Sequence, residues 1–120
     1  MMSKLAPVTV IETPEFQVAA QKLILCEDLM RLIEYLAYNP GAGDIIPGTG
    51  GVRKLRWALE GRGKRGGARV IYFFHDADMP LFALTAYAKN ERSDLTQADR
   101  NDFKQLTSIL VEAHKKRSKK

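Results

Sequence analysis

Residues 45–57 read Ile-Ile-Pro-Gly-Thr-Gly-Gly-Val-Arg-Lys-Leu-Arg-Trp, and the pattern of the chain changes within this stretch. Residues 41–51, which overlap the first half of this stretch, contain five glycines and one proline. This composition predicts an ordered loop. From Val52 on, polar and apolar residues alternate with the period of two that is typical of a β-strand. We therefore predict a loop over 41–51 and a strand over 52–59.

The alternation sorts the charges of this strand. Leu55 and Trp57 share one predicted face, and Lys54 and Arg56 share the other. Residues on strands are held rigidly, so two cations on one face are a candidate binding feature.

Further strands are predicted over 68–75 and 81–88, joined by a turn over 75–80. Together with 52–59 they form an antiparallel meander. Asp76 and Asp78 flank the turn and are expected to be turn formers.

Helices flank this meander. A short β-rich stretch over 8–11 precedes Thr13-Pro14-Glu15, which supplies an N-cap, a first-turn proline and a first-turn acid. Apolar residues then recur at helical spacing over 15–38, as two helices or as one helix bent near Cys26. A capping box at Thr96 and Asp99 starts a last helix, which leads into the basic tail 114–120.

The element order β, α, α, β, β, β, α predicts an α+β fold in a single domain over 1–120, with the basic tail frayed or solvated. We expect a three-strand meander plus an N-terminal strand, packed with two N-terminal helices and a C-terminal helix on one side of the sheet. Cys26 is the only cysteine, which excludes an internal disulfide, and we expect its thiol to be buried.

The net charge of +5 is concentrated in two segments. Residues 51–75 carry seven basic groups and one acidic group, and residues 113–120 carry five basic groups and no acid. The segments 1–50 and 76–112 each have a net charge of −3. Localised positive charge of this kind favours a polyanion such as nucleic acid.

Gly61-Arg62-Gly63-Lys64-Arg65-Gly66 matches the dinucleotide fingerprint G-x-G-x-x-G. That fingerprint requires a strand before it and a helix after it, and here a strand follows. We interpret the segment as a hairpin loop whose three cations either reach phosphates or keep a turn solvated.

Lys54 and Arg56 have possible partners on the neighbouring strands. Arg69 lies near the start of the second meander strand, and Thr85, Tyr87 and Lys89 lie on or just beyond the third. A shared polar face could hold a phosphate, with Tyr87 stacking on a base or relaying a proton. The alternative is a polar face that is simply solvated.

His75 and His114 are the only imidazoles, and we do not expect them to converge. Neither has a partner at metal-ligand spacing, so we predict no metal and no other cofactor. The N-terminus lacks the features of a secretory signal and no apolar run reaches membrane-spanning length, which together predict a soluble, cytoplasmic protein without a membrane partner.

Three blocks of sequence resemble the RelE/ParE toxin superfamily, and within it the HigB-like toxins of type II toxin–antitoxin systems. They are the 45–57 run, the segment from Gly63 to Phe73, and Tyr87-Ala88-Lys89-Asn90-Glu91. The resemblance covers nearly the whole chain. It implies a RelE-type fold and a metal-independent endoribonuclease, an mRNA interferase that cuts translated mRNA in the ribosomal A site. It also implies a cognate antitoxin, expected to be of the helix-turn-helix type.

The resemblance suggests the site residues. The Lys-Leu-Arg segment of RelE maps onto Lys54-Leu55-Arg56, and the arginine of its Gly-x-Arg segment maps onto Arg69. RelE-like sequences carry Lys-Arg after the last strand, whereas this chain has Lys89-Asn90, and the C-terminal catalytic tyrosine has no match after residue 90. The candidate catalytic residues are Lys54, Arg56, Arg69, Tyr87 and Lys89, and the candidate RNA-binding residues are Arg53, Arg62, Lys64, Arg65 and Arg92.

The sequence is also compatible with two other functions. A ParE-like inhibitor of DNA gyrase would bind protein and have no catalytic activity. A non-catalytic nucleic-acid-binding module would need only the charge distribution. The antitoxin could either cover the basic sheet face or block entry to the ribosome.

Overall fold

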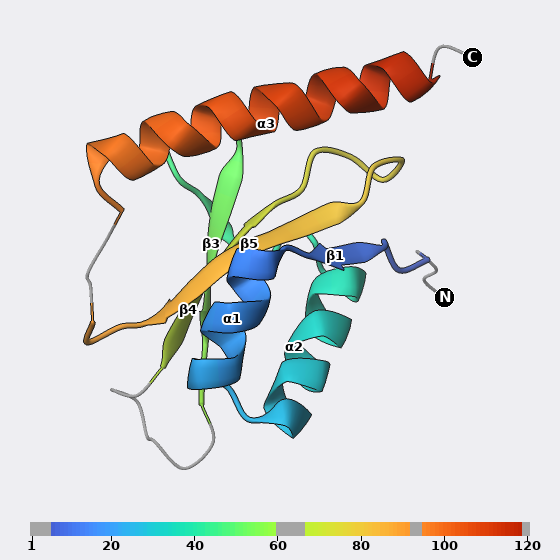
Figure 1. The fold of residues 1–120 in the computed structure, drawn as a ribbon. Coiled ribbons are helices and arrows are strands. Elements are labelled where there is room, and N and C mark those ends of the chain that lie inside the picture. Colours follow the sequence, from blue (N-terminus) through green and yellow to red (C-terminus); the bar gives the residue numbers. More distant parts are fainter. Residues whose placement is uncertain (1–5, 60–66, 92–94, 119–120) are drawn as a thin grey trace.

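The computed structural model describes residues 6–59, 67–91 and 95–118 and shows an α+β fold (Figure 1). Its elements in chain order are β1 (Val10–Glu12), α1 (Pro14–Leu23), α2 (Cys26–Tyr38), β2 (Asp44–Ile45), β3 (Val52–Trp57), β4 (Ala68–Phe73), β5 (Leu81–Ala88) and α3 (Gln97–Ser118). The predicted order of helices and strands is therefore confirmed, with one strand added. In the described part, no helix is both long enough and apolar enough to cross a membrane.

The strands form one sheet in the order β1-β5-β4-β3-β2. The meander β3-β4-β5 is antiparallel as predicted, and β1 pairs with β5 in parallel. The fifth strand, β2, lies inside the segment predicted as a loop, and it pairs antiparallel with β3 at the edge of the sheet. Strands β3 and β4 each end two residues earlier than predicted.

Local signals explain where the first two helices begin and end. The Thr13 hydroxyl accepts the N–H of Phe16 at 3.2 Å and caps α1, which begins at Pro14. Extended backbone at Ile24 and Leu25 then ends α1 and starts α2, so this region is two helices. Cys26 is the first residue of α2 and is exposed. The expectation of a buried thiol was wrong, because the cysteine lies at the junction and not on the inward face of a helix.

The capping box of the last helix is confirmed. Asp99 accepts the N–H of Thr96 at 3.0 Å, and Thr96 accepts the N–H of Asp99 at 3.0 Å. The helix continues to Ser118, so the first part of the basic tail is helical rather than frayed.

The helices cover both faces of the sheet, and the expectation that they share one side was wrong. On one face α1 and α2 pack over a core that includes Phe16, Leu32, Leu55, Val70 and Tyr72. On the other face Phe103, Leu106 and Leu110 of α3 pack over a second core. Figure 1 shows α3 crossing the sheet well away from α1 and α2. Because β3 and β4 contribute to both cores, their side chains alternate between two buried layers.

The second face is joined to α3 through the glycine-rich loop before β3. Thr49 is fully buried, and its hydroxyl donates to the Ile46 carbonyl at 2.7 Å and accepts the Val52 N–H at 3.0 Å. The Thr107 hydroxyl of α3 in turn donates to the Thr49 carbonyl at 3.1 Å. Gly50 has a φ of +78°, and a Cβ there would overlap the Thr107 hydroxyl. The loop therefore forms the surface on which α3 packs.

The segment between α2 and β2 is fixed by Tyr72 from the other side of the sheet. The Tyr72 hydroxyl accepts the Gly43 N–H at 2.8 Å and donates to the Pro40 carbonyl at 2.8 Å. Burial raises the pKa of Tyr72 above its usual value of 10.0, while the Gly43 hydrogen bond and the charge of Arg53 act against this rise.

We predict that Gly50→Ala destabilises the protein more than Gly48→Ala. Both glycines have positive φ, which costs an alanine about 1–2 kcal/mol. Only at Gly50 would the new Cβ also overlap Thr107, which adds about 1–3 kcal/mol of overpacking. Urea unfolding of the two variants measures the difference in the free energy of unfolding. Equal decreases for the two variants would show that the loop beneath α3 tolerates a side chain at Gly50.

We also predict a pH effect from Tyr72. Its pKa in the folded protein lies above 10.0, so between these two values only the unfolded chain releases the proton. The corresponding stability is fully present below pH 10 and is lost as the pH rises through the folded pKa. The free energy of unfolding should therefore fall more steeply above pH 10 in the wild type than in Tyr72→Phe, as measured by urea titration at each pH. Parallel curves would contradict the assignment.

Candidate nucleic-acid interface

The predicted cations of β3 lie on the α3 face of the sheet, as the alternation indicated. Arg56 of β3 is directly opposite Arg69 of β4 in the strand pairing, and Arg69 is opposite Tyr87 of β5. Two cations facing each other across neighbouring strands repel one another. An anion bound between or above them would relieve this repulsion, so the pair is a candidate phosphate-binding feature.

A pocket of about 340 Å³ lies at this end of the meander, and we call it the basic pocket. It is lined by Arg56, Trp57, Ala58, Gly67, Arg69 and Lys89. The backbone N–H of Lys89 donates to the Gly67 carbonyl at 3.1 Å, which holds the end of β5 beside the start of β4. The structure thus brings three predicted site cations, from three strands or their ends, around one hollow.

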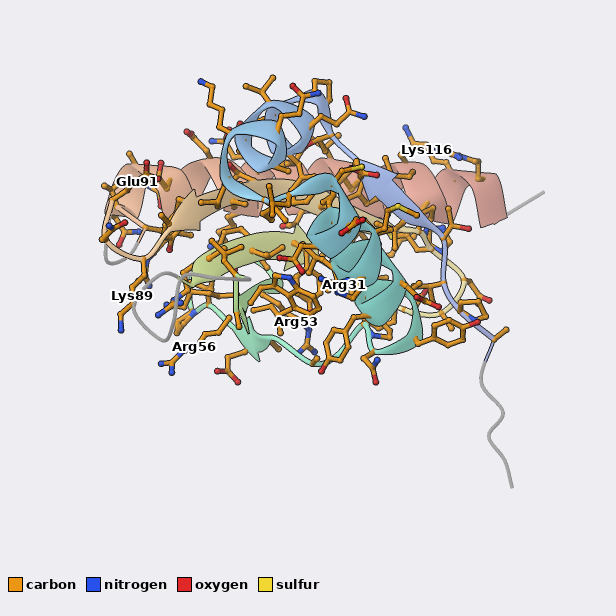
Figure 2. All side chains as sticks on the ribbon, turned by 90° about the horizontal axis from the view of Figure 1, so that it is seen from below. Arg31, Arg53, Arg56, Lys89, Glu91 and Lys116 are labelled. Atoms are coloured by element: carbon orange, nitrogen blue, oxygen red, sulfur yellow. The ribbon has the colours of Figure 1, made fainter. Side chains whose placement is uncertain are left out.

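Figure 2 shows the side chains of Arg56 and Lys89 extending on the same side of the molecule. Both residues are exposed, and Arg69 is half-buried between them and the sheet. A phosphate in the basic pocket would therefore meet the half-buried guanidinium of Arg69 and the two exposed cations, Arg56 and Lys89.

A second pocket, of about 450 Å³, lies beside the edge strand β2, and we call it the edge pocket. Its lining includes Asp44, Lys54, Arg56 and Arg100, together with Ala42, Ile45, Ile46, Pro47 and Leu55. Arg56 lines both pockets, so the two hollows adjoin along β3. Five described cations line one or both of these pockets, namely Lys54, Arg56, Arg69, Lys89 and Arg100.

Arg100 was not among the predicted site residues. It lies in the first turn of α3, and its guanidinium donates to the Pro47 carbonyl at 3.2 Å. The two residues are 53 positions apart, so no local pattern places Arg100 beside Lys54. The capping box fixes where α3 begins but not where its first turn lies on the sheet.

Tyr87 occupies a different environment from the one expected. Its ring is only 6% exposed and belongs to the core beneath α3, with Leu95 and Phe103. Strand alternation places Tyr87 on the cationic face, but α3 covers this part of the face. The prediction that Tyr87 stacks on a base would require the ring to leave this core.

Arg53 makes hydrogen bonds to the backbone within the fold. It lies on the α2 face of β3, where its guanidinium donates to the carbonyls of Gly41 at 3.2 Å and Gly43 at 2.7 Å. These bonds tie it to the segment before β2 rather than to either pocket. The remaining predicted RNA-binding residues, Arg62, Lys64, Arg65 and Arg92, lie outside the described residues.

The two histidines do converge, contrary to expectation. His75 and His114 each place Nε2 at 3.8 Å from an oxygen of Asp76, one on each oxygen. This cluster follows the far end of β4, six residues beyond Arg69, or roughly 20 Å at the rise of a strand. It therefore supplies no imidazole to the basic pocket. Across the described ranges no group of three or more metal-ligating side chains is placed to hold a metal ion.

Comparison with known protein families gives one finding. The family model described as the RelE toxin of the RelE / RelB toxin-antitoxin system matches residues 9–120. The match runs from the strand that precedes α1 to the end of the chain, so it includes every residue that lines the two pockets.

We predict that Arg69→Gln weakens binding of single-stranded RNA without destabilising the protein. Losing one phosphate contact should reduce the slope of log affinity against log salt by about 0.7. Because the facing cation is removed, the free energy of unfolding at low salt should stay equal or rise by about 0.5 kcal/mol. Filter binding and urea unfolding measure the two quantities.

Lys22→Gln is the matched control, since Lys22 is an exposed cation on α1 that lines neither pocket. Equal RNA affinity and salt dependence for wild type and Arg69→Gln would exclude Arg69 from the interface.

Proposed function

The chain belongs to the family of RelE toxins, and we propose that it acts as a ribosome-dependent mRNA interferase, the toxin of a type II toxin–antitoxin pair. The observation that supports catalysis best is the opposed pair Arg56 and Arg69 beside Lys89 in the basic pocket. A sheet that holds like charges face to face at one end is suited to an anionic reaction centre.

The chemistry that fits these residues is cleavage by the RNA's own 2′-hydroxyl. Attack on the adjacent phosphate produces a phosphorane-like transition state with more negative charge than the ground state. Cations held in advance by β3 and β4 would stabilise that charge without reorganising. Lys54, Arg56 and Arg69 would bind and stabilise the phosphate, and Lys89 would assist from the end of β5.

The proposed partners follow from this role. The substrate is mRNA on a translating ribosome, and a cognate antitoxin of the helix-turn-helix type would neutralise the protein. The chain has Asn90 where RelE-like sequences carry arginine, and it has no tyrosine after residue 90. From the resemblance of residues 45–57 we propose that it is a HigB-like toxin.

We predict that induction of the protein without antitoxin arrests growth and produces mRNA cuts in phase with codons. Arg56→Ala and Arg69→Ala should each lower the cleavage rate by about 100-fold or more, because each removes a cation that stabilises the transition state. Lys22→Ala should behave as the wild type. Primer extension on transcripts, with and without a translation inhibitor, measures the cuts.

The same experiment distinguishes the two other functions. Growth arrest with double-strand DNA breaks and intact transcripts would replace the proposal with a gyrase inhibitor. Normal growth with intact transcripts would leave a non-catalytic binding module.

A further inference from the structure

We infer that Asp44, at the sheet edge, is the general base that removes the proton from the attacking 2′-hydroxyl. The inference rests on the proposed interferase function and adds the proton acceptor that the cations cannot provide. Neither the alternation of the strands nor the family resemblance identified this residue.

Strand pairing places Asp44 beside the cations. Asp44 of β2 is directly opposite Lys54 of β3 in the antiparallel register, and directly opposed residues point to the same face of a sheet. Lys54 and Arg56 are two residues apart on that strand and share the α3 face. The Asp44 side chain, which is exposed, therefore lies on the cationic face.

The edge pocket confirms this placement in three dimensions. Asp44 of β2 lines it together with Lys54 and Arg56 of β3 and Arg100 of α3. Since Arg56 also lines the basic pocket, a phosphate held between Arg56 and Arg69 would have its ribose near the edge pocket. The volume of about 450 Å³ is large enough for a nucleoside.

Other proton acceptors in the described ranges lie elsewhere. Both histidines lie with Asp76 beyond the far end of β4. The Glu91 carboxylate, close to Lys89 in sequence, accepts the Ala88 N–H at 3.1 Å and lines a hollow beside α1. Among the described residues that line the basic and edge pockets, Asp44 is the only carboxylate.

The Asp44 carboxylate takes the 2′-hydroxyl proton as the 2′ oxygen bonds to phosphorus. The bond from phosphorus to the 5′ oxygen breaks, and that oxygen takes a proton from water. The products are a 2′,3′-cyclic phosphate and a 5′-hydroxyl, and Asp44 returns its proton to solvent.

The test is single-turnover cleavage of mRNA on programmed ribosomes by the wild type, Asp44→Asn and Asp44→Glu between pH 5.5 and 8.5. We expect Asp44→Asn to lower the rate constant by about 100-fold or more, the usual contribution of a general base. Its residual rate should rise tenfold per pH unit, because hydroxide replaces the missing base. Asp44→Glu should recover part of the rate. RNA affinity of Asp44→Asn should be unchanged or tighter, since a negative charge has been removed.

Asp78→Asn is the matched control, because Asp78 is an exposed aspartate in the turn between β4 and β5. It should leave both rate and pH profile unchanged. Cleavage by Asp44→Asn at the wild-type rate and with the wild-type profile would overturn the role of Asp44 and leave the interferase function standing. A wild type that cleaves no mRNA under any of these conditions would overturn both.

Discussion

The contact between α3 and the glycine-rich loop positions the helix beside the candidate site. Thr107 bonds the Thr49 carbonyl, and the absence of a side chain at Gly50 allows the helix to come this close. With α3 seated there, the apolar half of the second sheet face is covered. The cationic ends of β3 and β4 are left beside the helix and form the walls of two pockets. The glycine-rich loop 41–51, predicted only as an ordered loop, thus serves to dock a helix.

The placement of charge on the sheet is a compromise between stability and function. A sheet buried on both faces would be more stable with apolar residues throughout, yet β3 and β4 hold Arg56 opposite Arg69. Such an arrangement is unfavourable until an anion neutralises it. Departures from local consistency of this kind are expected at functional sites, where the cost is offset by the surrounding fold. Here the two cores and the hydrogen bonds of Tyr72 and Thr49 provide that support.

Local patterns in the sequence predicted the helices, the meander and the side of β3 on which Lys54 and Arg56 lie, because these depend on neighbours in the chain. Features that depend on tertiary contacts were missed. Strand β2 has only two residues, too few for an alternation to be visible. Arg100 reaches the edge pocket through a hydrogen bond to a residue 53 positions away in the sequence. Tyr87 is covered by α3, and the alternation of a strand does not predict where a helix packs on the sheet. The convergence of His75 and His114 likewise depends on where α3 crosses the sheet.

Phosphate binding at the cationic end of β3 and β4 is the property on which the proposed function depends. Its most direct test is an NMR titration of the arginine and lysine side-chain signals with a short 2′-O-methyl RNA, which lacks the attacking hydroxyl and is not cleaved. Phosphate binding there predicts that the signals of Arg56, Arg69 and Lys89 shift together and saturate at one RNA equivalent, while that of Lys22 on α1 stays in place. Saturable shifts confined to α1 and α2, with the signals of Arg56 and Arg69 unchanged, would contradict it.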